Sequence, residues 1–245
     1  MNISQLTDNY SYAILNNKEV IIVDPAESSS ILKYIKDNKL SLKAILLTHH
    51  HKDHTAGVGG ILDKIKAPVY SPNKKIKHTT ITIEDKDTIN LNFIKIEVIA
   101  TPGHTLDHVV FYSKENNILF SGDTLFRLGC GRIFEGTYQQ MFKSLQKINK
   151  LDNITDVYCG HEYTNTNLKF LLNNFPKSEE LLAEKNKINL QLQDKGSSIP
   201  FNLGNEKKLN PFLSPSLEYL NKLKNENNLS NFDIFSYLRD LKNSF

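Results

Sequence analysis

The sequence predicts a mixed α/β domain followed by a helical C-terminal region, and three observations support this fold class. Short runs rich in Val and Ile alternate with helical periodicity over the first two thirds of the 245 residues. Strand-like runs end near Thr164, and only helical periodicity recurs after it. His and Asp residues gather directly after several predicted strands, as chemical groups do in α/β proteins. We therefore expect an α/β domain over residues 1–165 and a helical domain over residues 166–245.

Apolar runs define the elements of the first domain in chain order. Strands are predicted at YAIL, VIIVD, KAILLTHH, APVYS and DVYCG, and helices at Ser28 to Asn38, Gly57 to Lys66 and Tyr138 to Lys150. The stretch from Thr79 to Ala100 alternates in the manner of successive antiparallel strands. VVFYSKENNILFSGD predicts a hairpin that turns at Asn116 and Asn117, because Asn tolerates left-handed backbone angles.

Helical periodicity dominates the second domain. It predicts helices over Asn165 to Asn174, Ser178 to Asp194, Ser216 to Asn227 and Asn231 to Leu241. The segment GSSIPFNLGNEKKLNPFLSP is rich in Gly, Pro, Ser and Asn, and is expected to be a loop.

Composition indicates a folded chain without the marks of a nucleic-acid or membrane protein. Hydrophobic residues make up 39% and charged residues 23%, which is far from the composition of disordered chains. The 30 basic and 27 acidic residues are spread along the chain, so no basic patch for nucleic acid or membrane emerges. No signal-peptide pattern or apolar stretch of about 18 residues occurs. We expect a cytoplasmic monomer in which Cys130 and Cys159 are free thiols that act as small buried packing residues.

Potential metal ligands are most concentrated in the segment THHHKDH, residues 48–54. It follows an apolar strand directly, and a turn and helix after the strand would point His49 and His51 differently from Asp53 and His54. One short segment could thus serve two adjacent ions. The alternative is a solvated loop that happens to hold four of the eight histidines.

Three later segments have the same form, a predicted strand followed by a Gly-containing turn with His or Asp at its tip. They are ATPGHT at His104, LFSGDT at Asp123 and VYCGHE at His161. A lone His is more often a structural residue than a ligand, but four such segments in one chain favour a metal site.

These motifs resemble the signature of the metallo-β-lactamase superfamily, H-x-H-x-D-H followed by His, Asp and His in matching contexts. The resemblance implies an αββα sandwich with two divalent metal ions. One ion would be held by His49, His51 and His104, the other by Asp53, His54 and His161, with Asp123 bridging. Imidazole and carboxylate ligands suit zinc, which we expect, and also iron or manganese.

Such a site predicts direct hydrolysis. Two adjacent cations lower the pKa of a shared water and stabilise a tetrahedral oxyanion, so no Ser or Cys nucleophile is needed. Asp123 and Asp53 are the candidate catalytic carboxylates, and Asp53 could also orient or deprotonate the water. Of the remaining histidines, His50 is expected either next to the ligands or at the surface, His108 near the site and His78 in a solvated loop.

Several segments resemble glyoxalase II within this superfamily. They are GDTLF at residues 122–126, GCGRIFEGT at 129–137, GHEYT at 160–164, NPFL at 210–213 and LRDLKNSF at 238–245. The resemblance implies a thioester hydrolase that converts S-(2-hydroxyacyl)glutathione, typically S-D-lactoylglutathione, to glutathione and a 2-hydroxy acid in methylglyoxal detoxification. It also implies that Arg132, Tyr163, Arg239 and Lys242 bind glutathione, whose carboxylates Arg and Lys can hold. The alternative for Arg239 and Lys242 is a cationic helix end favoured by the helix dipole.

Three positions depart from the glyoxalase II pattern. Phe134 stands where Tyr is common, Ser214 where Arg is common, and Asp107 where Gly is frequent. These differences concern substrate affinity and loop packing, since every proposed ligand is present. The alternative functions are a lactonase, a nuclease, a glutathione persulfide dioxygenase with one iron, and a non-catalytic binding protein that keeps the fold.

Overall fold

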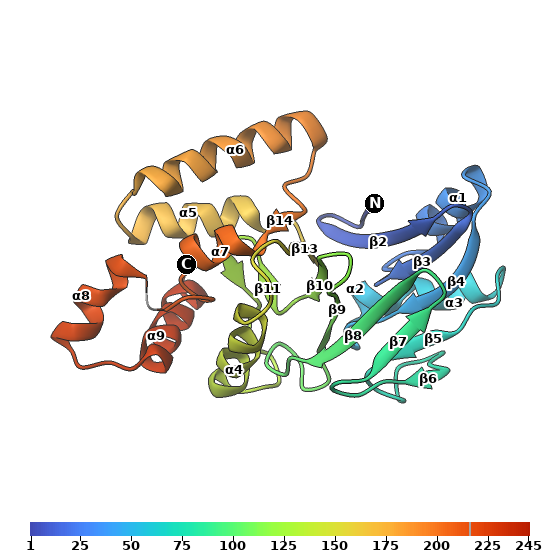
Figure 1. The fold of residues 1–245 in the computed structure, drawn as a ribbon, viewed down its shortest axis with the longest axis horizontal. Helices are drawn as coiled ribbons and strands as arrows, with labels where there is room; N and C mark the ends of the chain where they lie inside the picture. The colour runs from blue at the N-terminus through green and yellow to red at the C-terminus, as the bar shows by residue number, and fades with distance from the viewer. Residues whose placement is uncertain (216) are drawn as a thin grey trace. The chain divides into compact units, whose positions relative to one another are not determined.

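The structure is a computed structural model that describes residues 1–215 and 217–245 and forms two compact units (Figure 1). Unit 1 comprises Met1–Ala100 and Asp107–Gly122, and unit 2 comprises Thr101–Leu106 and Asp123–Phe245. Strands dominate unit 1, and most helices of the described residues lie in unit 2. The predicted order of an α/β region followed by a helical region is confirmed, whereas the domain boundary near residue 165 stays a prediction.

The first sheet of unit 1 combines an antiparallel edge with a parallel half. Its strands, in spatial order, are β1 (Asn2–Gln5), β2 (Asn9–Asn16), β3 (Glu19–Val23), β4 (Ser41–Leu46), β5 (Val69–Ser71) and β6 (Ile81–Thr82). The strands from β1 to β3 pair antiparallel, and those from β3 to β6 pair parallel. Helices α1 (Ser28–Asp37) and α3 (Gly57–Leu62) bury their apolar side chains in one cluster with this sheet. The cluster includes Ile31, Ile35, Val58 and Ile61 of the helices and Val20, Ile22 and Ile45 of the sheet. That burial fixes β3 and β4, whose ends carry the chemistry described below.

The second sheet of unit 1 is an antiparallel meander. It consists of β7 (Thr88–Leu91), β8 (Ile94–Ala100), β9 (Val109–Ser113) and β10 (Ile118–Gly122). The predicted hairpin at residues 109–123 is confirmed, and Asn117 adopts a left-handed φ of 53° at its turn. Tyr12 on β2 contacts Phe120 on β10 with ring centroids 5.4 Å apart, so the two sheets face each other across an apolar layer.

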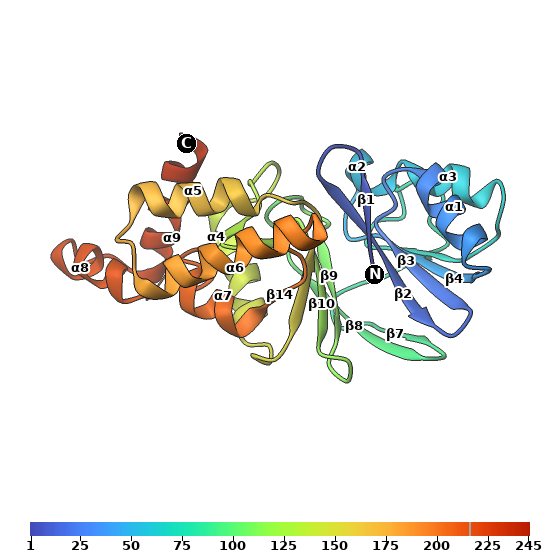
Figure 2. The same cartoon turned by 90° about the horizontal axis from the view of Figure 1, so that it is seen from above.

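Unit 2 places helices beside short strand pairs. It contains hairpin β11 (Leu125–Phe126) and β12 (Gly129–Cys130), the pair β13 (Asp156–Cys159) and β14 (Phe201–Asn202), and helices α4 (Tyr138–Asn149), α5 (Thr164–Asn174), α6 (Glu179–Lys195), α7 (Leu203–Leu209), α8 (Glu218–Glu226) and α9 (Asn231–Asn243). Figures 1 and 2 both show α5 and α6 side by side. Helix α9 packs on α4 through Phe142, Phe232 and Phe235.

Capping residues set the bounds of the main helices in unit 2. Thr137 forms a capping box with Gln140 at the start of α4, and Ser230 forms one with Asp233 at the start of α9. Gly196 ends α6 with a left-handed φ of 65°. The predicted helices therefore agree with α4, α5, α6, α8 and α9 to within a few residues, except that Ser216 lies outside the described residues.

Two sequence predictions about local structure were wrong. The stretch from Thr79 to Ala100 is not wholly antiparallel, because β6 pairs parallel with β5 in the first sheet. The predicted loop at residues 196–215 contains β14 and the seven-residue helix α7, which Asn202 caps by accepting a hydrogen bond from the backbone of Asn205. Gly204 and the flanking Asn and Pro residues are typical of loops, so the sequence did not predict this short helix.

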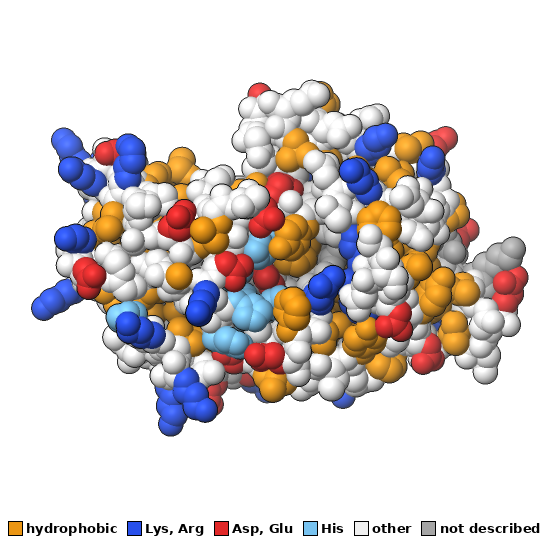
Figure 3. All heavy atoms as spheres, turned by 180° about the vertical axis from the view of Figure 1, so that it is seen from behind, with side chains coloured by type: hydrophobic (Ala, Val, Ile, Leu, Met, Phe, Trp, Pro, Cys, Tyr) orange, Lys and Arg blue, Asp and Glu red, His pale blue; other side chains and the backbone are white. Residues whose placement is uncertain are grey.

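Basic side chains are spread over the face shown in Figure 3, where acidic and apolar side chains lie between them. In the described part of the chain, no helix is long and apolar enough to cross a membrane.

Candidate functional site

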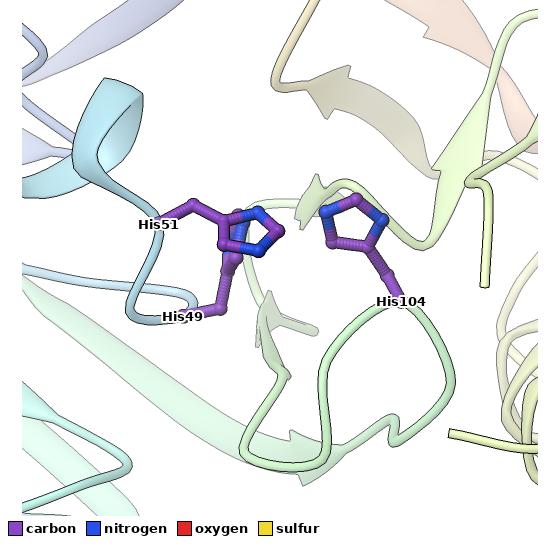
Figure 4. Close-up of side chains that lie close together, drawn as sticks. All are labelled: His49, His51 and His104. Carbon is purple, nitrogen blue, oxygen red and sulfur yellow. The ribbon is translucent and has the colours of Figure 1, made fainter. Parts of the chain in front are cut away.

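Four candidate ligands of unit 1 lie where the chain leaves β4. The strand ends at Leu46, and short helix α2 (Lys52–Thr55) begins after His51, so the segment turns between the ligands. Figure 4 shows His49 and His51 on this loop and His104 on a separate loop. The ligand atoms of His49 lie within 4.8 Å of those of His51 and of His54. This turn explains how one short segment presents several nitrogen atoms together.

Asp24 anchors this segment from the end of β3. Its carboxylate is 4% exposed and accepts hydrogen bonds from the backbone N–H of Thr48 at 2.8 Å and from the Thr48 hydroxyl at 2.6 Å. The same carboxylate lies 3.1 Å from Nδ1 of His54, so that nitrogen carries the proton and donates. The lone pair of His54 is then on Nε2, as a metal ligand requires.

Thr48 orients His49 in the same way. Its hydroxyl lies 3.0 Å from Nδ1 of His49, and because that hydroxyl already donates to Asp24, it accepts from the imidazole. Nε2 of His49 is thereby left as an acceptor or ligand. The ring of His108, fully buried, stacks on His49 with centroids 4.9 Å apart, which confirms the expectation that His108 packs beside the site.

Asn9 on β2 holds the carboxylate of Asp53. Its amide donates to Oδ2 of Asp53 at 3.0 Å and to the Asp53 carbonyl oxygen at 3.1 Å. Asp53 is 39% exposed and lies 3.7 Å from Nε2 of His54. An oriented, partly exposed carboxylate beside an imidazole can bind a cation or accept a proton from water.

His50 pairs with a residue that departs from the glyoxalase II pattern. Its Nδ1 lies 3.0 Å from Oδ1 of Asp107, and the amide of Asn73 donates to Oδ2 of Asp107 at 3.2 Å. The half-exposed His50 is therefore held by Asp107 at the surface of unit 1, as its variable position in the signature predicts. His78 is exposed, also as predicted.

Unit 2 contains a second group of candidate ligands on three loops. His104 follows β8, Asp123 follows β10, and His161 follows β13. Oδ2 of Asp123 lies 3.4 Å from Nε2 of His104 and 3.3 Å from Nε2 of His161. All three residues are at most 5% exposed. A buried carboxylate oxygen approached by two imidazoles has the arrangement that a bridging ligand needs.

The backbone of unit 2 orients His104. Its Nδ1 donates to the carbonyl oxygen of Arg132 at 2.8 Å, which leaves the Nε2 lone pair on the side of Asp123. Gly131 makes this approach possible, because a Cβ atom there would lie 1.9 Å from the carbonyl oxygen of Asp123. Any larger residue would displace the loop that carries Asp123.

The predicted glutathione-binding residues differ in their surroundings. Arg132 is exposed, and Tyr163 is 37% exposed and stacks on His161 with centroids 4.7 Å apart. Arg239 is 4% exposed, donates to the carbonyl oxygen of Cys130 at 3.2 Å and lies over the ring of Phe212. The glutathione-binding role of these residues stays a prediction.

Lys242, the fourth of these residues, is half-buried near the end of α9. Its Nζ donates to the carbonyl oxygen of Thr166 at 3.3 Å and lies over the rings of Phe170 and Phe245. Burial, with a smaller contribution from the nearby Arg239 charge, lowers the pKa of Lys242 to about 8. The charge of this side chain therefore varies near neutral pH.

The two cysteines are buried, as predicted. The thiol of Cys159 donates to the carbonyl oxygen of His161 at 3.3 Å, and Cys130 contacts the Arg239 guanidinium. Burial raises the pKa of both thiols, so neither is the thiolate that a cysteine nucleophile requires.

Sequence reasoning missed the residues that orient the ligands. Asp24, Thr48 and Asn9 act through hydrogen bonds between distant segments, which no spacing rule contains. Asp24 did carry a signal, since a carboxylate closes the apolar run VIIVD just before a turn. The Arg132 carbonyl carried none, because every residue has one.

Two family models together cover almost the whole chain. Residues 6–161 match the metallo-beta-lactamase superfamily, and residues 162–245 match the hydroxyacylglutathione hydrolase C-terminus. The chain is 41% identical over 251 residues to the hydroxyacylglutathione hydrolase of Pectobacterium atrosepticum, with 100% of this chain and 99% of the relative covered. It is 40% identical over 245 residues to the enzyme of that name from Pelagibacter ubique, with 98% and 97% covered.

Solved structures show the same fold at lower sequence identity. ETHE1 from Myxococcus xanthus matches with a TM-score of 0.68 and 22% identity, covering 98% of this chain and 96% of that one. The BLEG-1 B3 metallo-beta-lactamase matches with a TM-score of 0.64 and 23% identity, covering 84% and 94%. TTHA1623 in a di-iron-bound form matches with a TM-score of 0.63 and 23% identity, covering 86% and 98%. The predicted metallo-β-lactamase fold is confirmed.

Proposed function

Because the chain belongs to the hydroxyacylglutathione hydrolase family of the metallo-β-lactamase superfamily, we propose that it hydrolyses S-(2-hydroxyacyl)glutathione thioesters. The products are glutathione and a 2-hydroxy acid, typically D-lactate from S-D-lactoylglutathione formed in methylglyoxal detoxification. The observation that carries the proposal is the family match over both parts of the chain, together with a complete set of candidate metal ligands. The seven ligands fall inside residues 6–161.

We propose that these ligands bind two divalent cations. His49, His51 and His104 hold one ion, Asp53, His54 and His161 hold the other, and Asp123 bridges them. Supporting this, hydrogen bonds fix Nδ1 of His49, His54 and His104, so each ring keeps Nε2 for a metal. The nitrogen and carboxylate donors suit zinc, iron or manganese, and zinc is our first expectation. Bound there, the ions would activate water and polarise the thioester carbonyl.

The chain's own carboxylates supply the remaining chemistry. Asp53 would orient a water molecule or accept its proton, which its hydrogen bond from Asn9 and its partial exposure support. Asp123 offsets the repulsion between neighbouring cations, which neutral imidazoles cannot do. A thiolate leaves readily, so no strong general acid is required, and the two buried thiols take no part.

We propose that the glutathione part binds to Arg132, Tyr163, Arg239 and Lys242. Arg132 and Tyr163 are exposed, and Lys242 offers an ammonium group for a carboxylate. Arg239 also donates to backbone carbonyls of the β11–β12 hairpin, so only the remaining donors of its guanidinium are available to a ligand. Residues 166–245, with a boundary near residue 165, would form the substrate-binding domain.

The full-length relatives do not favour the alternatives of a lactonase, nuclease or persulfide dioxygenase. Loss of metal ligands would mark a non-catalytic binding protein, and all seven are present. We further propose that the enzyme acts as a monomer in the cytoplasm, where the two free thiols would stay reduced.

The deciding experiment is hydrolysis of S-D-lactoylglutathione by purified protein of measured metal content, followed at the thioester absorbance. We expect turnover that rises with metal content towards two ions per chain and disappears with a chelator. Oxygen consumption with glutathione persulfide would instead support the dioxygenase. Fully metallated protein without thioesterase activity would refute the proposal.

A further inference from the structure

Arg127 is a buried cation at the tip of the β11–β12 hairpin, four residues after Asp123. Its side chain is 1% exposed, although a buried guanidinium is costly unless it is paired and hydrogen-bonded. Neither the superfamily signature nor the proposed glutathione-binding set includes this residue. Its partners show what it connects.

The guanidinium of Arg127 binds two segments of unit 2. Its Nε and Nη2 donate to Oε1 of Glu184 on α6, with 3.2 Å for the Nε contact. Its Nη1 donates to Oε1 of Gln191 and to the carbonyl oxygen of Ser198, each at 2.7 Å. Arg127 thus ties the Asp123 loop to α6 and to the segment that follows it.

Ser198 continues the connection to the loop of another candidate ligand. Its backbone N–H donates to Oε2 of Glu162 at 2.7 Å, and its hydroxyl donates to Oε1 of Glu162 at 2.7 Å. The same hydroxyl lies 2.6 Å from that of Thr164. Glu162 directly follows His161, so one chain of hydrogen bonds runs from the His161 loop through Ser198 to Arg127.

The hairpin itself is held in a strained shape. Leu128 adopts a left-handed φ of 58°, which is unfavourable for a residue with a Cβ atom. Its N–H donates to the buried Glu206 at 2.8 Å, and the amides of Asn167 and Asn210 donate to the carbonyl oxygens of Arg127 and Gly129 at 3.0 Å each. These contacts make the hairpin a rigid connector between Arg127 and the segment that carries Asp123.

We propose that Arg127 and Ser198 form a positioning link that sets the spacing between the Asp123 loop and the His161 loop. The inference rests on the proposed metal-binding function and adds a residue that acts through the ligands. In the structure, Oδ2 of Asp123 lies 3.3 Å from Nε2 of His161, and the link spans the two loops that carry them. Helix α6 takes part in metal binding through this link, although it carries no ligand.

A buried ion pair can also be a purely structural feature, and the two roles predict different behaviour. Replacing both partners of such a pair by apolar residues is often neutral for stability. The double variant Arg127→Met/Glu184→Leu should therefore keep the folded state while it removes the contact to Ser198. Replacement of a residue that orients a metal ligand typically lowers metal affinity or activity by about 10- to 100-fold.

The test compares wild type, this double variant, Arg127→Met and the control Lys187→Met. Lys187 is exposed on α6, so its replacement removes the same charge from the same region. The measurements are thermal stability, the apparent Kd for Zn²⁺ and the absorption spectrum of the Co²⁺-substituted protein. For the double variant we expect wild-type stability, metal affinity weaker by about 10- to 100-fold and an altered Co²⁺ spectrum. The control should match wild type in all three.

A double-mutant cycle with Glu162→Gln completes the test. If Glu162 and Arg127 act through one link, their losses in metal affinity will not multiply in the combined variant. Multiplying losses, or a double Arg127/Glu184 variant with wild-type metal affinity and Co²⁺ spectrum, would overturn the link. If the double Arg127/Glu184 variant is unstable, the double-mutant cycle is measured with Arg127→Lys and Glu162→Gln, and that cycle tests the link. Wild-type protein that binds no metal would instead refute the proposed function.

Discussion

The candidate ligands of the two units are supported in different ways. In unit 1, four ligands lie within six residues, and side chains at strand ends orient them through Asp24, Thr48 and Asn9. In unit 2, three candidate ligands come from loops far apart in the sequence, and the Arg132 carbonyl and hydrogen bonds through Arg127 and Ser198 hold those loops. Ligands that are close in sequence still need side chains from elsewhere to fix their tautomers.

The candidate ligands of the two units therefore depend on their supporting residues in different ways. Two candidate ligands of unit 1, His49 and His54, depend on one buried carboxylate, Asp24, which contacts Thr48 and His54 together. The candidate ligands of unit 2 depend on contacts spread over several segments, among them the Arg132 carbonyl, Arg127 and Ser198. We therefore expect single replacements to be severe at Asp24 and graded among the residues that support unit 2.

The largest effect is expected for Asp123→Ala, because Asp123 lies between two imidazoles and is the proposed bridge. Removal of the bridging carboxylate exposes two cations to mutual repulsion and costs several kcal/mol. We expect the loss of at least one ion per chain and a fall in kcat of about a thousandfold or more.

Metal analysis and thioester kinetics on the same sample check this prediction. Asp156→Ala is a suitable control, since Asp156 is exposed on β13 of the same unit and should retain both metal and turnover. If Asp123→Ala kept two ions and near-wild-type turnover, the ligands of unit 2 would not include the bridge.

Asp24→Asn should have the next largest effect. The amide keeps the size of the carboxylate, but it cannot accept from the Thr48 N–H, the Thr48 hydroxyl and Nδ1 of His54 together. We expect metal affinity and kcat/KM to fall by up to about a hundredfold. Metal titration is the measurement, and Asp63→Asn, at an exposed position of unit 1, is the control. Equal behaviour of the two variants would mean that Asp24 does not support the ligands.

The sequence points to the candidate ligands more readily than to the residues that support them, for a physical reason. His49, His51, Asp53 and His54 stand out because such a density of ligands follows an apolar strand, and the strand endings are read from local pattern. The pairings His54 with Asp24 and Arg127 with Ser198 join residues 30 and 71 positions apart in the chain. Only the folded arrangement brings such residues together.

The same limit explains the errors in local structure. Helices α4, α6 and α9 have capping residues and clear periodicity, so the sequence located them. Helix α7 and strand β6 are short and owe their form to tertiary contacts, as when the N–H of Leu203 donates to the carbonyl oxygen of Thr155. Local pattern carries little information on elements as short as β6, or on a short helix such as α7 that contains Gly.

Lys242→Ala tests a part of unit 2 that holds no ligand, and its effect should be the smallest. If Lys242 binds a glutathione carboxylate, its loss should raise KM about tenfold and leave kcat nearly unchanged, since the contact is alike in the ground and transition states. Because the pKa of Lys242 is lowered to about 8, wild-type KM should also rise as pH increases from 7 to 9 and the ammonium loses its proton. The variant should lack this rise.

Steady-state kinetics at several pH values, with metal content held equal, measure both effects. A small thioester without glutathione should be hydrolysed equally by wild type and Lys242→Ala, because the proposed metal ligands are untouched. Lys187→Ala, at an exposed position of α6, should behave as wild type with either substrate. A Lys242→Ala variant with wild-type KM, or with equal losses on both substrates, would remove Lys242 from the glutathione-binding set. Arg132 and Tyr163 would then be the exposed candidates that remain on unit 2.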